Sequence, residues 1–236
     1  MASGILKGIL VLLAAVPLTL GALIGIPFQK NGEITHAMAR AWSRFILWIY
    51  SIHVDIQGVQ NIEAGKNYVY AANHASMFDI PTVIGSIPDQ IRLVLKKELT
   101  RIPFWGWALK YGGYISIDRS NPIAAKKSLA AAAEKIRDGT SVLLFAEGTR
   151  TRDGKLQPFK RGAFALATQS GVPILPVTIN NSFRILPKGS LKVQPQDIEL
   201  IIDQAIPTIG IDGKEAELIL MERVRAVVAK NFVEQT

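Results

Sequence analysis

The sequence YAANHASMFDIP, residues 70–81, carries the side chains best suited to proton transfer. An apolar run ends at Asn73, and Asp79 follows His74 by five residues. A histidine in the turn before a helix can reach such a carboxylate, which then fixes one ring tautomer and steadies the imidazolium. Asn73 or Ser76 can close the turn through hydrogen bonds to the backbone. His74 and Asp79 are therefore candidates for a general base and its orienting carboxylate, although a loop histidine tied to a cap has the same residues.

A second polar cluster follows the apolar run SVLLF. Gly148 permits a tight backbone turn whose N–H groups can face an anion, and Arg150 and Lys160 come after it. Arg119 follows another apolar run and offers the same fork of donors. These side chains suit a phosphate, while a solvated basic loop has the same composition. Glu147 can either pair with an arginine or hold a substrate hydroxyl.

Short apolar runs alternate with helical patterns after residue 53, and together they predict the elements that carry these clusters. The predicted strands are 67–73, 91–96, 113–118, 141–146, 172–179 and 197–203, and the predicted helices are 122–138, capped by Asn121, and 213–232. Several strands are apolar on both faces, as in a sheet that helices cover. The pattern predicts an α/β fold with a mostly parallel or mixed central sheet flanked by helices. Because ligands gather at the carboxyl ends of such strands, we expect the clusters to form one cleft.

Residues 8–28 contain no charged side chain and form a helix about 30 Å long, roughly the thickness of a bilayer core. Pro17 makes a kinked or re-entrant helix as plausible as a straight one. A cleaved signal peptide is less favoured, because Lys7 is the only charged side chain before the run and no A-x-A site follows it. We expect this segment to associate with a membrane.

Residues 33–52 show apolar side chains at helical spacing, with Arg40 and Arg44 between them. This pattern indicates an amphipathic helix lying in the membrane interface, and a core-facing helix is the alternative. Together with Lys30, the two arginines favour a cytoplasmic position for the rest of the chain, at the inner membrane if the cell is bacterial. The sequence thus divides into residues 1–52, a membrane-associated helical segment, and residues 53–236, the α/β domain.

The composition narrows the chemistry further. The chain has 236 residues, three histidines, no cysteine and a formal net charge of +8. Without cysteine there are no disulfides and no thiol nucleophiles, and the scattered histidines give no zinc spacing, so we expect no metal. The charge favours an anionic partner. We expect an anionic lipid surface and not nucleic acid, because the basic residues cluster beside lipid-facing sequence.

Taken together, the clusters resemble the motifs of the glycerolipid acyltransferase family, of the bacterial 1-acyl-glycerol-3-phosphate acyltransferase type. The first block, N-H-x-S-x-x-D, is met by Asn73, His74, Ser76 and Asp79; the second by Gly113, Ile115, Ile117, Asp118 and Arg119; the third, F-x-E-G-T-R, by Phe145, Glu147, Gly148, Thr149 and Arg150; the fourth by Ile174, Leu175, Pro176 and Val177. The resemblance covers about residues 50 to 210. One mild departure is Thr151, where the family often has serine.

The resemblance implies an activity and roles for these residues. His74, oriented by Asp79, would deprotonate the free hydroxyl of a lysophosphatidic acid, which attacks the thioester of acyl-CoA or acyl carrier protein to give phosphatidic acid. Arg119 and Arg150 would hold the phosphate with help from Lys160. Glu147 and Thr149, beside Gly148, would contact the glycerol. The acyl donor is a co-substrate, and no cofactor is implied.

Three alternatives remain open at the level of sequence. The first is an acyltransferase with another acceptor, such as glycerol 3-phosphate or a lyso-aminolipid. The second is a hydrolase that uses Ser76 with His74 and Asp79, which is disfavoured because Ser76 lies in no G-x-S-x-G elbow. The third is a non-catalytic membrane-binding protein driven by charge.

Overall fold

The structure, a computed structural model, describes residues 2–118 and 120–234. Within these residues a seven-stranded sheet has the order β1-β7-β6-β2-β5-β3-β4. The strands are β1 (Val54–Gln57), β2 (Val69–Ala72), β3 (Ile91–Lys96), β4 (Ile115–Ile117), β5 (Ser141–Phe145), β6 (Ile174–Asn180) and β7 (Ile198–Ile202). Each pairing in this sheet is parallel except β6 with β7. The predicted mixed sheet is confirmed.

Strand β1 was not predicted. Its four residues, VDIQ, alternate between half-buried and exposed at the edge of the sheet. A strand of this kind lacks the continuous apolar run that marks the central strands. The six predicted strands all exist, with ends that differ from the predicted ones by up to two residues.

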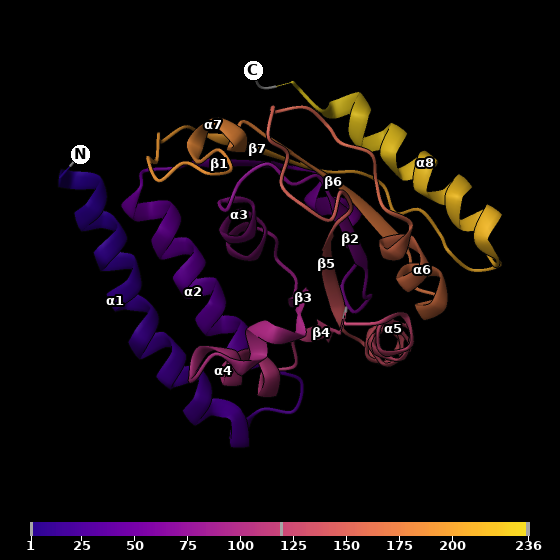
Figure 1. The fold of residues 1–236 in the computed structure, drawn as a ribbon, viewed down its shortest axis with the longest axis horizontal. Coiled ribbons are helices and arrows are strands. Elements are labelled where there is room, and N and C mark those ends of the chain that lie inside the picture. Colours follow the sequence, from indigo (N-terminus) through magenta and orange to yellow (C-terminus); the bar gives the residue numbers. More distant parts are fainter. Residues whose placement is uncertain (1, 119, 235–236) are drawn as a thin grey trace.

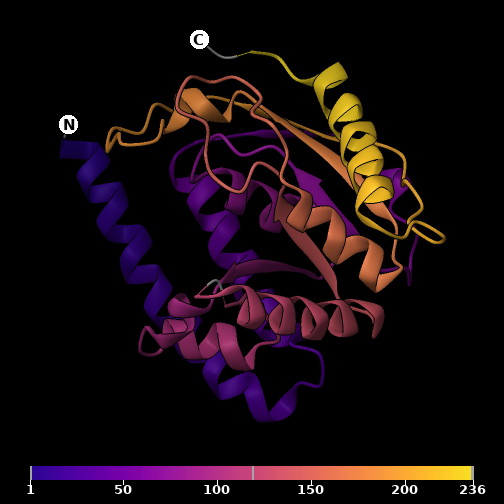
Figure 2. The same cartoon turned by 45° about the vertical axis from the view of Figure 1, so that its right-hand side comes forward.

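Helices cover both faces of the sheet (Figures 1 and 2). The α-helices are α1 (Ala2–Gly25), α2 (Glu33–Ile49), α3 (Asp79–Ser86), α4 (Trp105–Tyr111), α5 (Pro122–Arg137), α6 (Arg161–Ser170), α7 (Ser182–Ile185) and α8 (Lys214–Asn231), and the 3-10 helices are η1 (Ile26–Phe28), η2 (Val59–Asn61) and η3 (Lys97–Arg101). Helices α2 and α3 pack on one face, while α5, α6 and α8 pack on the other. Helix α1 lies outside α2, at the periphery of the molecule.

The central strand β2 shows why both faces need a helical cover. Tyr70 and Ala72 belong to the hydrophobic cluster beneath α2 and α3, whereas Val69 and Ala71 belong to the cluster beneath α5, α6 and α8. All four side chains are buried. Each large apolar side chain buried in this way stabilises the fold by about 1.5–3 kcal/mol. The carboxyl end of β2, where the His74 turn begins, is therefore held on both sides.

Two helices begin and end within one residue of the predicted bounds. Asn121 is the N-cap of α5, and its side-chain oxygen accepts the backbone N–H of Ala124 at 2.8 Å. Pro122 occupies the first turn, where its missing N–H costs nothing. In α8 the side chains of Val224 and Val228 are fully buried and belong to the same hydrophobic cluster as α5 and α6.

The N-terminal helix has the dimensions of a membrane span. Residues Gly4–Phe28 form 25 helical residues that are long and apolar enough to cross a bilayer, and only 11% of the tested window is buried. The α1 helix continues through Pro17, so the break that this proline could have caused is not seen. Phe28 is 80% exposed at the end of this segment. The surface of the segment Gly4–Phe28 is thus apolar and largely exposed.

Helix α2 lies between α1 and α3, and this position corrects part of the sequence interpretation. Its inward residues Ile46 and Leu47 join the same cluster as the sheet. Arg40 donates hydrogen bonds to carbonyls at the end of α3 and just beyond it, including Asp89 O at 2.8 Å, and Arg44 donates to Gly85 O at 2.9 Å. The two arginines of the predicted interfacial helix therefore cap α3. The core-facing alternative describes this side of α2, while Trp48 on the other side is 73% exposed.

Candidate active site

The His74–Asp79 pair forms directly from the local fold. Asp79 is the first residue of α3, and the turn after β2 folds His74 back toward it. The distance from His74 Nδ1 to Asp79 Oδ2 is 2.7 Å, so the predicted contact is present. Because the carboxylate can only accept, Nδ1 carries the proton and Nε2 is left as the acceptor. This is the tautomer that a general base requires.

The Asp79 carboxylate is held by the turn as well as by the imidazole. Its Oδ2 atom accepts the backbone N–H groups of Ala75 at 2.7 Å and Ser76 at 2.8 Å. The side chain is fully buried, and Oδ1 has no hydrogen-bond partner among the residues that the structure describes. One carboxylate oxygen therefore fixes both the backbone of the turn and the plane of the His74 ring.

The ring of Phe145 packs against one face of the imidazole. The two rings stack with centroids 3.8 Å apart and planes 13° apart. This contact follows from the parallel register of β2 and β5, in which Ala72 pairs with Phe145. The His74 side chain is left 14% exposed. The imidazole is thus fixed at Nδ1 and across one face, with a small part of it open to the outside.

Glu147 lies inside the protein and not at the surface of a cleft. Its Oε1 atom accepts the backbone N–H of His74 at 2.5 Å, and its Oε2 atom accepts the N–H of Gln157 at 2.8 Å. Only 2% of the residue is exposed. Burial raises the pKa of this carboxyl group to about 7, the two N–H donors lower it, and the charge of Asp79 raises it again. In the structure, Glu147 thus positions the backbone of His74, and its expected contact with a glycerol hydroxyl stays a prediction.

Asn73 and Ser76 shape the turn. The Asn73 side chain accepts the N–H of Ile179 at 2.7 Å and donates to its carbonyl at 2.9 Å, which ties the turn to β6. The Ser76 hydroxyl donates to Leu186 O at 3.2 Å and accepts from Phe78 N. Within the described residues, no hydrogen bond joins this hydroxyl to the His74 ring. This geometry argues against Ser76 as a nucleophile activated by His74.

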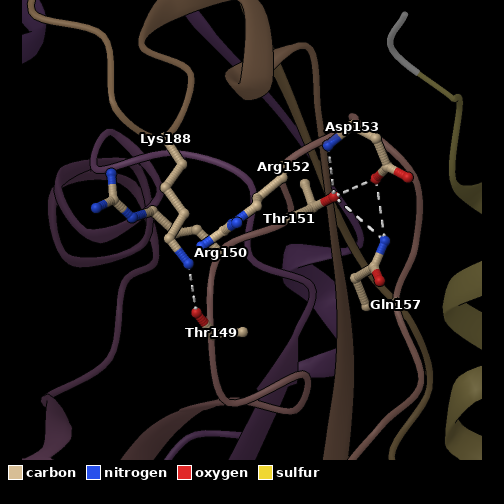
Figure 3. A pocket seen from close by; sticks show the side chains of 7 residues that line it. All are labelled: Thr149, Arg150, Thr151, Arg152, Asp153, Gln157 and Lys188. Atoms are coloured by element: carbon tan, nitrogen blue, oxygen red, sulfur yellow. Dashed lines mark hydrogen bonds between the residues drawn. The ribbon is translucent and has the colours of Figure 1, made fainter.

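The third motif leads into a surface hollow of about 360 Å³. Its lining residues are Thr149, Arg150, Thr151, Arg152, Asp153, Gln157 and Lys188. In Figure 3 the long cationic side chains gather on one side, and a hydrogen-bonded group of Thr151, Asp153 and Gln157 lies on the other. The hollow adjoins the histidine, because the N–H of Thr151 donates to His74 O at 2.9 Å. A cationic hollow thus lies beside the candidate base.

Gly148 and Lys160 lie beside this hollow without lining it. Gly148 has a φ of +69°, a backbone conformation that favours glycine. A Cβ atom at this position would lie 2.9 Å from Cδ of Lys160, so the lysine stem passes directly over the turn. The glycine therefore serves the turn and a close approach at once, and Lys160 adds positive charge nearby.

The second motif is only partly described. Arg119, the predicted phosphate ligand at the end of β4, lies outside the described residues. Its neighbour Asp118 accepts from Ser120 N at 2.9 Å and from Lys97 Nζ at 2.9 Å, and hydrogen bonding by Ser120, followed by Lys97, holds the pKa of Asp118 well below its usual range. Because β4 is the edge strand and β5 and β3 separate it from β2, its carboxyl end lies about 14 Å along the sheet from that of β2.

Two residues of the site were missed by the sequence interpretation. Phe145 belongs to the F-x-E-G-T-R block, but nothing in one sequence says that its ring lies flat on the imidazole. Lys188 comes from the segment after α7, which carries no recognisable motif. A basic residue following Pro187 was a weak signal, and only the fold brings it to Thr149.

Comparison with known proteins agrees with this arrangement. The sequence profile of the acyltransferase family matches residues 53–180. A 1-acyl-sn-glycerol-3-phosphate acyltransferase of Pseudomonas aeruginosa is 34% identical, over 89% of this chain and 80% of that protein. The chloroplastic 1-acyl-sn-glycerol-3-phosphate acyltransferase BAT2 of Brassica napus is 32% identical over 93% of this chain, which spans 63% of that relative's length.

The fold also has a solved counterpart. The crystal structure of the 1-acyl-sn-glycerophosphate (LPA) acyltransferase PlsC from Thermotoga maritima matches with a TM-score of 0.74 and 26% identity, over 95% of each chain. The likeness extends from the α/β domain through the N-terminal helices, because so little of either chain lies outside the match. With the family profile covering more than half of the sequence, these findings show that this chain belongs to the acyltransferase family.

Proposed function

We propose that this chain transfers an acyl group from a thioester donor to the sn-2 hydroxyl of 1-acyl-sn-glycerol 3-phosphate, giving phosphatidic acid. One observation carries the proposal: a His–Asp pair with a buried carboxylate adjoins a hollow lined by cationic side chains, linked through Thr151 N–H and His74 O. The pair suits a hydroxyl, and the hollow suits a phosphate. The names of the relatives describe an acceptor that has both groups.

The reaction begins with His74. With Nδ1–H bound to Asp79, Nε2 takes the proton of the acceptor hydroxyl as its oxygen attacks the thioester carbonyl. The tetrahedral intermediate then collapses: the carbon–sulfur bond breaks, and the thiolate receives the proton from the imidazolium. Asp79 stabilises the imidazolium between these steps. No acyl group is held by the protein, since the hydroxyl of the acceptor is the only nucleophile required.

The phosphate of the acceptor binds in the hollow. Arg150 presents a fork of N–H donors that matches phosphate oxygens, and the Thr149 hydroxyl and the charge of Lys160 lie on the same turn or beside it. Arg119 adds a further fork from the end of β4 in this proposal. Holding the phosphate fixes the distance from the headgroup to the sn-2 hydroxyl, which supplies the positioning part of catalysis.

The donor in this proposal is acyl-CoA or acyl carrier protein, and the reaction takes place at a membrane. Donor and acceptor both carry acyl chains that are costly to expose to water. Helix α1 supports this location by its length and its exposed apolar surface. The α/β domain lies on the cytoplasmic face in this proposal, on the positive-inside rule applied to Lys30, Arg40 and Arg44.

A thiol-release assay tests the proposal directly. Purified protein in detergent with acyl-CoA should release thiol when 1-acyl-sn-glycerol 3-phosphate is added, and His74→Ala should lower kcat by about 10³-fold or more, in line with the loss of a positioned base. His53→Ala is the matched control, because His53 is exposed and lies before β1. Faster release with a phosphate-free lysolipid would overturn the acceptor, and full activity of His74→Ala would overturn the mechanism.

A further inference from the structure

Lys188 brings a cation to the hollow from a distant part of the chain. It lies beyond α7, on the segment that connects β6 to β7. Its Nζ atom donates to the Thr149 hydroxyl at 3.0 Å (Figure 3), although 39 positions separate the two residues in sequence. The side chain is half-buried. A lysine held by a neutral hydroxyl keeps its full charge available to a ligand.

The segment that carries Lys188 is fastened to the His74 turn. Two residues before it, Leu186 O accepts the hydroxyl of Ser76 at 3.2 Å. Further hydrogen bonds close the segment on itself, from Ser190 N to Pro187 O at 3.0 Å and from Gln194 N to Ile185 O at 2.8 Å. These hydrogen bonds therefore hold the backbone at Lys188 in a fixed position relative to His74.

The charges in the hollow are unbalanced. Arg150, Arg152 and Lys188 are three cations, and Asp153 is the only acidic residue that lines the hollow in the part of the chain described here. The Oδ1 atom of Asp153 already accepts from Thr151 Oγ1 at 2.8 Å and from Gln157 Nε2 at 3.1 Å. This oxygen of the carboxylate is thus already hydrogen-bonded within its own loop. Three cations held near one another repel, so a multiply charged anion would bind favourably.

We propose that Lys188 binds the acceptor phosphate together with Arg150 and selects for its second negative charge; this inference rests on the proposed function. An arginine fork pairs with two phosphate oxygens, and a lysine adds a compact point charge toward the third. The Thr149 hydroxyl, while accepting from Lys188, still has its own hydrogen to donate to the same phosphate. A phosphomonoester carries close to two charges at pH 7, whereas a phosphodiester carries one. Lys188 therefore favours a free terminal phosphate over a substituted headgroup.

Steady-state kinetics with 1-acyl-sn-glycerol 3-phosphate test the role of Lys188. In Lys188→Ala we expect the KM for this acceptor to rise about tenfold, the loss typical of a charge-assisted hydrogen bond, with kcat changed less than about twofold. The KM for acyl-CoA should stay unchanged. Lys188→Arg should recover part of the affinity. Lys192→Ala is the matched control, because Lys192 is an exposed lysine on the same segment that does not line the hollow.

The pH dependence separates charge selection from a structural effect. The second ionisation of a phosphate monoester has a pKa of about 6, so the acceptor KM of the unaltered protein should fall as pH rises from about 5.5 to 7.5. In Lys188→Ala this fall should be smaller. Competition with a lysophosphatidylglycerol, a phosphodiester, should weaken several-fold less in Lys188→Ala than competition with a non-reacting phosphomonoester. A parallel pH profile for both proteins would overturn the inference.

Equilibrium binding distinguishes this inference from the proposed function. Titration of 1-acyl-sn-glycerol 3-phosphate into detergent-solubilised protein should give about tenfold weaker affinity for Lys188→Ala than for the unaltered chain. Equal affinities would overturn the role of Lys188 while leaving the proposed function intact. A rise in the acyl-CoA KM alone would also overturn it, since Lys188 would then serve the donor. Absence of turnover with this acceptor in the unaltered protein would instead overturn the proposed function.

Discussion

The His74 turn and the cationic hollow lie side by side but are built in opposite ways. In the turn, Asp79 and Glu147 are buried and their oxygens accept backbone N–H groups at short distances. In the hollow, Arg150 and Lys188 belong to separate segments, and a hydrogen bond of 3.0 Å from Lys188 Nζ to the Thr149 hydroxyl joins Lys188 to the third motif. The turn fixes one ring with little freedom, whereas the hollow offers charge to whatever anion enters. Variants in the turn should therefore change kcat, and variants in the hollow should change KM.

Asp79→Asn should have the largest effect. The amide group cannot accept from His74 with the same strength, and its NH₂ end opposes the N–H groups of Ala75 and Ser76. We expect kcat to fall by about 10³-fold or more, as when a general base loses its orienting carboxylate. The acceptor KM should stay within about threefold of the original value, because the hollow is untouched. Circular dichroism should confirm that the variant is folded. A raised KM with normal kcat would contradict the assignment of kcat to the His74 turn.

Glu147→Gln should have an intermediate effect on kcat. The glutamine oxygen can accept only one of the two N–H groups, from His74 or from Gln157, so one buried donor loses its partner at a cost of about 1–3 kcal/mol. We expect kcat to fall about tenfold as the His74 backbone loosens, with the KM little changed. Exposed Glu98 provides the control substitution, Glu98→Gln. Unchanged kcat would show that the turn does not need this brace.

The same variant should change how stability depends on pH. Glu147 has a pKa of about 7 in the folded chain, raised from 4.5, so the unfolded chain releases its proton first as pH rises. Its contribution to stability is therefore fully present below pH 4.5 and is lost as pH rises to about 7. This loss is on the order of 3 kcal/mol and should disappear in Glu147→Gln. Denaturant unfolding at pH 5 and pH 7.5 measures it, and an equal pH dependence in both proteins contradicts the assignment.

Ser76→Ala should have the smallest effect. Ser76 lies in the His74 turn and is hydrogen-bonded to the segment that carries Lys188, so this variant tests the link between the turn and the hollow. Its hydroxyl donates to Leu186 O, on the segment that carries Lys188, and makes no bond to the His74 ring in the described structure. We expect kcat to stay within about twofold and the acceptor KM to rise about two- to fivefold, the cost of one lost neutral hydrogen bond. Loss of nearly all activity, or an acyl group trapped on Ser76, would revive the hydrolase alternative.

The sequence predicted most of the fold because its central strands are continuous apolar runs. β2 and β6 are buried throughout and β5 over its first three residues, and their composition needs little tertiary context to be recognised. β1 was missed because an edge strand of four alternating residues has no such signature. Helix α2 was assigned to the membrane interface because its amphipathic pattern is the same whether the apolar side meets lipid or protein. Its packing against α3 decides between these, and packing is not written in the spacing of one segment.

The candidate site was predictable where its residues are close in sequence. His74 and Asp79 are five positions apart, so local geometry alone can join them. The hydrogen bonds of Glu147 could not be predicted, since a carboxylate in a basic loop gives no sign that two backbone N–H groups will bind it. Lys188 could not be found, because its place beside Thr149 depends on the strand order that puts β6 and β5 on either side of β2.

The stacking of α1, α2 and α3 sets a lateral offset for the whole catalytic apparatus. Asp79 begins α3, α2 packs against α3, and α1 packs against α2 on its far side. With helix axes about 8–10 Å apart, α1 stands about two spacings from the helix that anchors the carboxylate. If α1 enters a bilayer as proposed, its depth and tilt also set the height of His74 relative to the membrane, because the three helices pack against one another. Shortening or lengthening the apolar face of α1 would then shift His74 along the membrane normal, relative to the lipid headgroups.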